Sequence, residues 1–246
     1  MNQTNFDVII IGAGPSGIFC AYELMRKHPG MEILMIEKGR PIENRVCPKR
    51  KTKVCVGCKP CSITTGFAGA GAFSDGKLSL SPDVGGTLPD ILGYDEALDL
   101  IQESDSIYLK FGADTNVYGV DKQKEIEDIR RKAIQANLKL IECPIRHLGT
   151  EEGYKIYTRL QEHLLSEGVH MEFLTMVQDI LIENGRAYGV VTDKGETYYA
   201  KEIVAAIGRE GSDWFSHICG SHGIETQVGT VDIGVRGEVR DEVMEF

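Results

Sequence analysis

A glycine-rich turn near the amino terminus is the first pattern with a specific chemical use. Gly12-Ala13-Gly14-Pro15-Ser16-Gly17 follows a β-branched run, Phe6 to Ile11, and precedes a helical pattern. In such a turn the first glycine permits the tight bend, the second lets the backbone approach a pyrophosphate, and the third lets helix and strand pack closely. The helix N-terminus adds free N–H groups and a positive potential. The spacing predicts a dinucleotide site.

A carboxylate follows at the place where such a site needs one. Ile33 to Ile36 forms a second apolar run, and Glu37 ends it, 20 residues after Gly17. There a carboxylate accepts hydrogen bonds from ribose hydroxyls. Lys38 and Arg40 come directly after and are included in the candidate site. Strand, turn, helix, second strand and acid together indicate a ligand, and a glycine-rich turn without one is the alternative.

Four of the seven cysteines lie in one short stretch, residues 40–61, which we call the four-cysteine segment. Cys55, Cys58 and Cys61 stand at C-x2-C-x2-C spacing, and Cys47 is remote and precedes a proline. This arrangement favours a [4Fe–4S] cluster over zinc, whose sites usually consist of two separated C-x2-C pairs. Three interpretations stay open, namely an iron–sulfur cluster, a zinc site, and reduced or reactive thiols without metal.

The four-cysteine segment is also basic. It holds seven Lys/Arg against one Asp/Glu, a net of +6 in a chain of net −10. These cations would stabilise thiolates and a negatively charged cluster, or would dock an acidic electron-carrier protein. The basic residues nearest the cysteines are Arg45, Lys49, Arg50, Lys51, Lys53 and Lys59.

Later segments distinguish between the dinucleotides that the turn could bind. A helix, a small β-meander over 176–200 and a further buried strand resemble the FAD-binding folds of the glutathione reductase type. The runs 66–78 (GFAGAGAFSDGKL), 146–150 (RHLGT) and 206–211 (AIGREG), with the four-cysteine segment, resemble a group of bacterial FAD-dependent dehydrogenases of undefined substrate. The resemblance extends over nearly the whole chain. It implies FAD and a redox activity, but no particular substrate.

The resemblance extends the candidate cofactor site. Glycines in the 66–78 run would let backbone N–H groups approach a phosphate or the flavin edge, with Asp75 and Lys77 contacting ribityl or ring polar atoms. Val177, at the start of the meander, would offer backbone contacts to adenine, and Trp214 would lie in the core or over the cofactor. A mobile loop and an ordinary strand residue are the alternatives for the 66–78 run and Val177. The full predicted cofactor set is Gly12, Gly14, Pro15, Ser16, Gly17, Glu37, Lys38, Arg40, Gly69, Ala70, Gly71, Ser74, Asp75, Lys77, Val177 and Gly208.

The remaining patterns predict the elements that position these groups. Helices are expected over 94–111, over 121–137 with an apolar stripe, and over 151–167 with Thr150 as N-cap. Strands are expected at 138–143, 170–174, 176–182, 187–192, 196–200 and 203–207. The predicted class is α/β, a Rossmann-like FAD-binding fold with a parallel sheet and a β-meander, plus the start of a second domain. The expected divisions are 1–45, 46–93, 94–150, 151–215 and 216–246.

Composition sets the broad class. The 246 residues are 42% hydrophobic and 26% charged, which is typical of a globular protein with a sizeable core. The net charge of −10 argues against nucleic-acid binding. No apolar stretch is long enough for a membrane span and no signal peptide is evident, so a cytoplasmic protein without membrane partners is expected.

We therefore expect an FAD-dependent oxidoreductase that acts on a small redox substrate through hydride or electron transfer. No catalytic acid or base can be named. A NAD(P)-dependent oxidoreductase and a non-catalytic FAD- or metal-binding fragment or redox sensor are the alternatives. The alternation of Val231, Ile233 and Val235 is typical of a strand that opens a substrate domain, so the chain alone is expected to be incompetent as an enzyme and prone to self-association.

Overall fold

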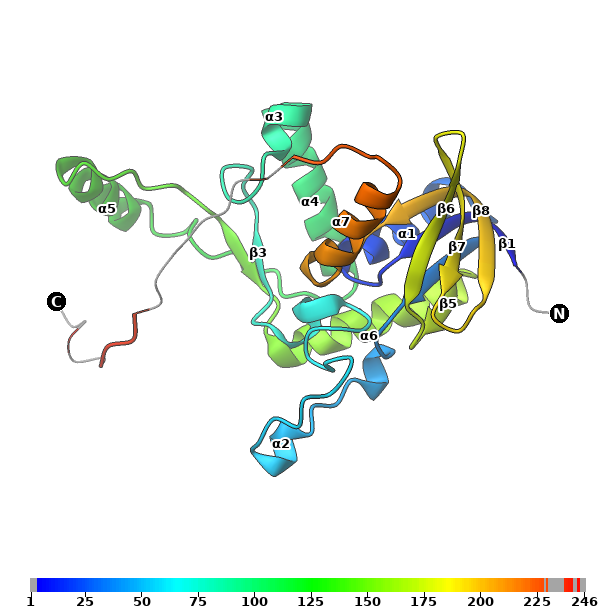
Figure 1. Ribbon diagram of the computed structural model, residues 1–246. Helices are drawn as coiled ribbons and strands as arrows, with labels where there is room; N and C mark the ends of the chain where they lie inside the picture. Colours follow the sequence, from blue (N-terminus) through cyan, green and yellow to red (C-terminus); the bar gives the residue numbers. More distant parts are fainter. Residues whose placement is uncertain (1–3, 228, 230–236, 241–242, 244–246) are drawn as a thin grey trace.

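The fold is built on one six-stranded sheet with the strand order β5-β2-β1-β8-β7-β6 (Figure 1). The computed structural model describes residues 4–227, 229, 237–240 and 243. Strands β5, β2, β1 and β8 run parallel to one another, β7 pairs antiparallel with β8, and β6 pairs antiparallel with β7 at the edge of the sheet. The strands are β1 (Asn5–Ile11), β2 (Ile33–Glu37), β5 (His170–Phe173), β6 (Val177–Glu183), β7 (Arg186–Thr192) and β8 (Thr197–Ala205).

The register brings three carboxyl ends to one edge of the sheet. Ile11 at the end of β1 pairs with Ile36 of β2 on one side and with Ala205 of β8 on the other. Parallel sheets bind ligands in the crevice outside these ends. The glycine-rich turn after β1, Glu37 at the end of β2 and the loop after β8 therefore meet at one place.

Alternate residues of β1 serve two separate layers of core. Val8 and Ile10 pack under α1 (Pro15–Lys27) and α6 (Thr150–Ser166), where Ile18 and Leu160 are fully buried. Ile9 points to the opposite face, where the meander strands β6 and β7 cover it with Ile180 and their other apolar side chains. Because β1 and β2 are covered on both faces, their sequences are almost continuously apolar.

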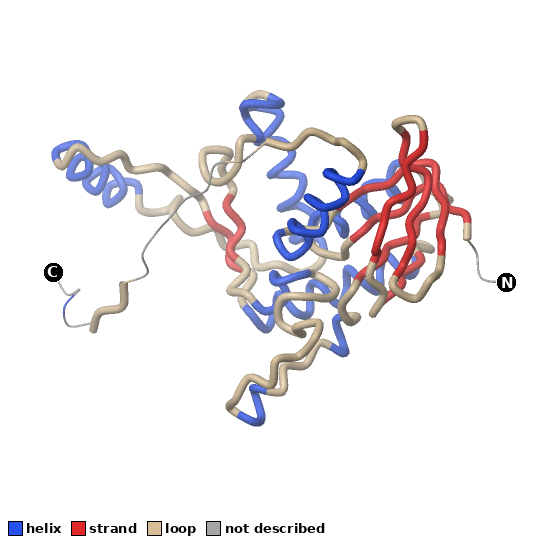
Figure 2. The backbone as a smooth tube through the Cα atoms, in the orientation of Figure 1, coloured by secondary structure: helices blue, strands red, loops and turns tan. Residues whose placement is uncertain are grey.

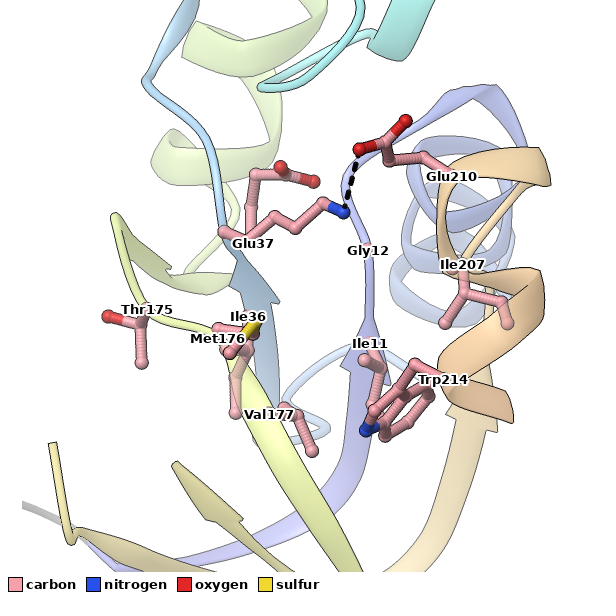
Figure 3. Close-up of a pocket in the computed structure, with 12 residues that line it drawn as sticks. Ile11, Gly12, Ile36, Glu37, Thr175, Met176, Val177, Ile207, Glu210 and Trp214 are labelled. Atoms are coloured by element: carbon pink, nitrogen blue, oxygen red, sulfur yellow. Dashed lines mark hydrogen bonds and ion pairs between the residues drawn. The ribbon is translucent and has the colours of Figure 1, made fainter. Parts of the chain in front are cut away.

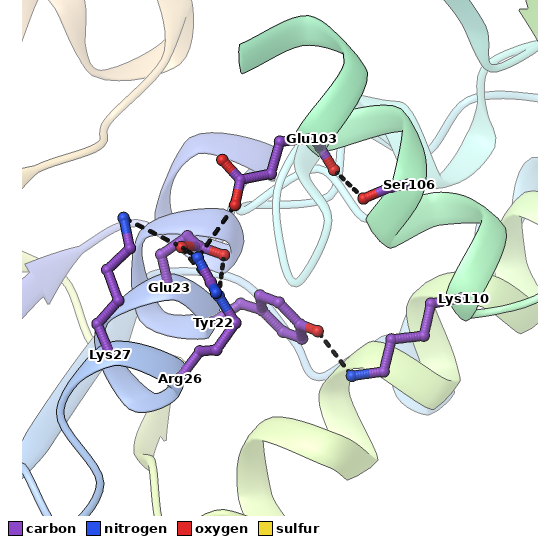
Figure 4. Close-up of polar contacts among 7 residues, drawn as sticks. All are labelled: Tyr22, Glu23, Arg26, Lys27, Glu103, Ser106 and Lys110. Atoms are coloured by element: carbon purple, nitrogen blue, oxygen red, sulfur yellow. Dashed lines mark hydrogen bonds and ion pairs between the residues drawn. The ribbon is translucent and has the colours of Figure 1, made fainter. Parts of the chain in front are cut away.

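Helix α4 (Tyr94–Lys110) is fastened to α1 by polar contacts at the surface (Figure 4). The Arg26 guanidinium lies 3.0 Å from the Glu103 carboxylate, and the Lys110 ammonium donates to the Tyr22 hydroxyl at 2.7 Å. Deeper in this layer, the hydroxyls of the buried Tyr108 of α4 and Tyr157 of α6 are 2.9 Å apart. These contacts fix α4 and α6 relative to the glycine-rich turn.

The other elements are short or stand apart from the sheet. Figures 1 and 2 show α5 and α2 projecting from the main body on two sides. β3 pairs antiparallel with β4 in a separate two-stranded sheet. The bounds are η1 (Ile42–Asn44), α2 (Lys49–Thr52), η2 (Gly69–Phe73), β3 (Lys77–Ser79), α3 (Leu88–Leu92), α5 (Gln123–Gln135), β4 (Ile145–His147), η3 (Arg209–Gly211) and α7 (Ser212–Ser221).

Several predicted elements differ from the structure. Residues 138–143 form no strand, because this stretch leaves Leu138 and Ile141 exposed and has no partner strand along its length; the strand is β4, which begins just after it. The predicted strands 196–200 and 203–207 are one strand, β8, whose polar middle faces solvent while its backbone stays paired with β1. The predicted cap Thr150 is the first residue of α6, and its side chain makes no capping hydrogen bond.

The apolar stripe of the helix at 121–137 is not core. Helix α5 contains no buried residue, and Ile129 and Ile134 are 53% and 66% exposed. The periodicity thus predicted the helix correctly but not its environment. The predicted strand at Val231, Ile233 and Val235 lies outside the described residues. In the part of the chain that the structure describes, every helix is too short or too polar to cross a bilayer.

Candidate functional site

The glycine-rich turn has the geometry that its three glycines predict. Gly12 has a φ of +102°, and a Cβ there would lie 2.5 Å from the main-chain oxygen of Ala206. A Cβ on Gly17 would lie 2.1 Å from the oxygen of Gly12, so helix α1 sits directly on the turn. Gly14 differs, since a Cβ there would meet no atom within 4 Å. The space beside Gly14 is an open cradle that fits a ligand phosphate.

Glu37 is a buried carboxylate, only 6% exposed, at the end of β2. Its Oε2 accepts the Ala13 N–H at 2.9 Å and its Oε1 accepts the Gly39 N–H at 2.7 Å. These bonds tie the glycine-rich turn to the chain that follows β2. Each carboxylate oxygen keeps further acceptor capacity, which suits hydrogen bonds from a pair of ribose hydroxyls.

Two adjoining cavities open at this edge of the sheet and share Gly12, Glu37, Lys38, Ile207 and Glu210 as a common wall. The smaller one, of about 100 Å³, is mainly apolar and is shown in Figure 3. The larger one has about 490 Å³. We call the two together the cleft. The smaller cavity is completed by Ile11, Ile36, Thr175, Met176, Val177, Gly211 and Trp214, and the larger by Gly14, Pro15, Thr64, Thr65, Gly66, Gly69, Ala70, Gly71, Ala206, Gly208 and Arg209.

An ion pair crosses the wall that the two cavities share. The Lys38 ammonium, directly after β2, lies 3.4 Å from the Glu210 carboxylate of η3, and both residues line the shared wall with Gly12. The dashed line that ends on Glu210 in Figure 3 marks this ion pair. The Lys38 and Glu210 side chains are 33% and 59% exposed. Such a pair contributes little to stability and can open readily.

Most of the predicted cofactor residues line this cleft. The glycine-rich turn, the end of β2, the 3-10 helix η2 and the first residue of β6 contribute side chains or backbone to its walls. The predicted residues that line it are Gly12, Gly14, Pro15, Glu37, Lys38, Gly69, Ala70, Gly71, Val177 and Gly208.

Six predicted residues lie elsewhere. Ser16 and Gly17 are in the first turn of α1, behind the cleft lining. Arg40 lies outside the lining of both cavities, and its main-chain oxygen accepts the Phe67 N–H at 3.0 Å. Ser74, Asp75 and Lys77 follow η2 outside the lining; the Asp75 carboxylate lies 3.5 Å from both the Lys77 ammonium and His147 Nε2.

The structure also adds residues that sequence reasoning did not assign. Thr64 and Thr65 line the larger cavity, although they carry no recognisable motif and reach it only because of tertiary packing. Trp214, which the sequence analysis expects in the core or over the cofactor, lines the smaller cavity. Its indole N–H donates to the main-chain oxygen of Gln178 at 2.9 Å and tethers α7 to β6. Glu210 had a signal, since it lies in the 206–211 run that carries the family resemblance.

Arg45 is a further residue that sequence reasoning did not assign to the cofactor site, and it lies beside the cleft. Its side chain is 3% exposed, and its guanidinium donates to the main-chain oxygens of Ser62, Ile63, Phe67 and Gly69 at 2.6–3.1 Å. Burial lowers the pKa of Arg45 to about 10, partly opposed by the negative charges of Glu37 and Cys61. Arg45 therefore stays protonated at neutral pH while enclosed by the loop that forms one cleft wall.

The four-cysteine segment does not assemble a metal site in the structure. Within the described residues, which include all four cysteines, no three His, Cys, Asp or Glu side chains are grouped as a metal would require. Cys55 and Cys61 are exposed and Cys47 and Cys58 half-buried. The pKa of Cys61 is lowered because its thiolate receives hydrogen bonds from the Thr64 and Ile63 N–H groups and the Thr64 hydroxyl. This local arrangement suits a reactive thiol.

Comparisons with known sequences match the amino-terminal part of the chain. A profile of the Thi4 family matches residues 1–42. The tRNA uridine 5-carboxymethylaminomethyl modification enzyme MnmG of Streptococcus pyogenes serotype M5 (strain Manfredo) is 32% identical over 65 residues. That stretch is 26% of this chain and 10% of the relative, so the similarity spans about a tenth of the curated protein. The residues that the Thi4 profile matches include the glycine-rich turn and Glu37.

Comparisons with solved structures cover most of the chain. Glycine oxidase from Geobacillus kaustophilus aligns with 90% of this chain and 59% of its own, at a TM-score of 0.53 and 15% identity. L-amino acid deaminase from Proteus vulgaris, with its specific insertion sequence deleted, aligns with 88% of this chain and 56% of its own, at a TM-score of 0.51 and 16% identity. The sheet order and the glycine-rich turn agree with these alignments, so the chain has a mixed α/β, Rossmann-like fold of the kind found in these two structures.

Proposed function

We propose that this chain binds FAD along the cleft and works as an FAD-dependent oxidoreductase. The observation that carries the proposal is the meeting of the Gly14 cradle with the buried Glu37 carboxylate at the carboxyl edge of β1, β2 and β8. That combination supplies the two features that a dinucleotide site needs, namely open space for a diphosphate and a hydrogen-bond acceptor for ribose hydroxyls.

In this proposal the adenine of FAD occupies the smaller cavity and the diphosphate occupies the larger one. The smaller, apolar cavity with Val177 and Trp214 suits the adenine ring. Glu37, on the shared wall, would accept hydrogen bonds from the adenosine ribose. The N–H groups at the start of α1 beside Gly14 would receive the diphosphate in the larger cavity.

Bound FAD would supply two-electron redox chemistry. The chain's own residues hold the cofactor and limit water access to it. Gly69, Ala70 and Gly71 bring main chain without bulky side chains to the larger cavity, so that wall can approach a flat ring or its ribityl chain closely. Thr64 and Thr65 add hydroxyls on the same side.

A NAD(P)-dependent enzyme is less well supported by the site. The Glu37 carboxylate, held by two N–H groups, would repel the 2′-phosphate of NADP. Two similar folds with TM-scores above 0.5 are named as a glycine oxidase and an L-amino acid deaminase. The metal centre in the four-cysteine segment stays a prediction, which iron, sulfide and zinc analysis after anaerobic reconstitution tests.

The test of FAD binding uses the full chain and a Glu37→Gln variant. Purified wild type should retain flavin absorbance through desalting, or bind added FAD in a fluorescence titration. Glu37→Gln should weaken FAD binding by about 1.5–3 kcal/mol, the contribution of a hydrogen bond to a charged group, which is roughly 10- to 150-fold in Kd. Glu183→Gln, an exposed glutamate at the end of β6, is the matched control and should bind as wild type.

A thermal melt of each variant accompanies the titration, because Glu37 also receives two main-chain N–H groups. A folded Glu37→Gln protein that binds FAD as tightly as wild type would show that Glu37 does not bind the ribose hydroxyls. A wild-type chain that binds no FAD at any workable concentration would remove the proposed function.

A further inference from the structure

Two arginines are buried among the residues that the structure describes, and they differ in how their charge is balanced. Arg146 is 4% exposed and forms two hydrogen bonds to the Asp105 carboxylate at 2.5 and 2.7 Å. Arg45 is equally buried, but its hydrogen bonds all go to main-chain oxygens. A buried charge is costly unless it is paired. Arg45 therefore carries a positive charge for which the folded chain provides no hydrogen-bonded anion among the described residues.

The loop that surrounds Arg45 is a wall of the cleft. The guanidinium draws the main-chain oxygens of Phe67 and Gly69 inward, each at 2.6 Å. In a trans peptide the N–H points opposite to the preceding C=O. The N–H groups of Ala68 and Ala70 are consequently turned away from Arg45, and that of Ala68 donates to the Ala13 oxygen in the glycine-rich turn at 2.7 Å.

Close packing leaves this loop little freedom to rearrange. Gly66 has a φ of +125°, and a Cβ on it would lie 2.8 Å from Arg45 Cδ. The Arg45 guanidinium also lies 4.8 Å from the centre of the Phe73 ring, at the end of η2. Gly66, Gly69, Ala70 and Gly71 line the larger cavity, so the side chain of Arg45 determines where that wall stands.

We infer that Arg45 is the positioning residue for the diphosphate in the larger cavity. Glu37 and Cys61 act on its charge only through space, so the positive charge is free of a hydrogen-bonded anion and attracts the diphosphate, while its hydrogen bonds hold the wall in place. The inference rests on the proposed function, since it concerns the same cleft. It makes Arg45 act through the loop, behind the lining and without direct contact to the ligand. Charge acting across a dry protein wall is screened less than charge on the surface.

The experiment compares adenosine, ADP and FAD as ligands of the full chain and its variants. Arg45→Met should weaken ADP and FAD binding by about tenfold or more, because both carry the diphosphate. It should weaken adenosine binding by less than about threefold, because adenosine has no phosphate for the charge to attract. Arg45→Lys should recover part of the ADP affinity, because a lysine keeps the charge but loses the planar set of donors.

Arg146→Met is the matched control, since it also removes a buried arginine but lies outside the cleft lining. It should lower the melting temperature and leave the ratio of adenosine to ADP affinity unchanged. Equal losses for adenosine and ADP in Arg45→Met would show a merely structural role and overturn the inference, and so would an Arg45→Met affinity for ADP equal to that of wild type. A wild type that binds neither ADP nor FAD would remove the proposed function and this inference with it.

Discussion

Two alanine substitutions in the glycine-rich turn separate folding from binding. Gly14→Ala and Gly17→Ala add the same methyl group three residues apart. At Gly17 that methyl would lie 2.1 Å from the Gly12 oxygen and 3.2 Å from Ile10 Cγ2, both within the packed fold. At Gly14 it would meet nothing within 4 Å, in a backbone conformation with φ −74° that alanine adopts freely. The first methyl enters the protein and the second enters the cleft.

The expected free-energy changes have different sizes and affect different properties. Gly17→Ala forces helix α1 away from the turn and should cost about 1–3 kcal/mol of unfolding free energy or more, as overpacking does. Gly14→Ala should not lower the free energy of unfolding by more than about 0.5 kcal/mol. It can raise it by about 0.4–1 kcal/mol, because alanine reduces the conformational entropy of the unfolded chain. Its methyl occupies the phosphate approach, so FAD binding should weaken at least about tenfold, which is about 1.4 kcal/mol.

The assays are urea unfolding without ligand and FAD titration, each on both variants. Gly220→Ala is the control, because Gly220 in α7 also has open space around its Cβ position and lies outside the cleft. It should bind FAD as wild type does, and its free energy of unfolding should equal that of wild type or exceed it by up to about 1 kcal/mol, because alanine favours a helix more than glycine does. A Gly17→Ala protein as stable as wild type would refute the packing argument, and a Gly14→Ala protein with wild-type affinity would refute the placement of the diphosphate.

Three further outcomes are expected. The pKa of Asp7 is lowered from its ordinary value of 3.8, chiefly by the hydrogen bond that Lys201 donates to its carboxylate. The ionised carboxylate therefore stabilises the fold above pH 3.8, and this contribution is lost as the pH falls through the lower pKa of the folded state. Asp7→Asn should be less stable than wild type at pH 7 in urea unfolding and as stable as wild type in strong acid. Cys61 should be alkylated by iodoacetamide faster than Cys55, which is also exposed, when peptides are quantified by mass spectrometry, and equal rates would contradict the hydrogen-bonded thiolate. Tyr108→Phe alone should cost about 1–3 kcal/mol by leaving the Tyr157 hydroxyl unpaired, while the double Phe variant should lose less than the sum of the two single variants in a double-mutant cycle.

The parts of the site that could be predicted are those encoded locally. The turn from Gly12 to Gly17 and the acid Glu37 lie within one βαβ unit, where glycine spacing and an apolar run suffice to place them. Val177 was placed through the resemblance, and it lines the smaller cavity.

The parts that could not be predicted depend on contacts between distant segments. Arg45 looked like one more cation of a basic surface, and only the loop wrapped around it shows a buried charge. The apolar stripe of α5 has helical periodicity, yet periodicity does not say what packs against a helix. Cysteine spacing predicts a ligand set only when the backbone folds the side chains together, and the described residues hold no such group.

The hydrogen bonds of Glu37 have one more consequence, for the thermodynamics of binding. Because the Ala13 and Gly39 N–H groups already hold the carboxylate, the cleft has its shape before any ligand arrives. The conformational entropy of ordering this corner is lost during folding and not again on association. A ligand therefore meets a preorganised surface, and its affinity depends on the contacts it makes with walls that are already in place.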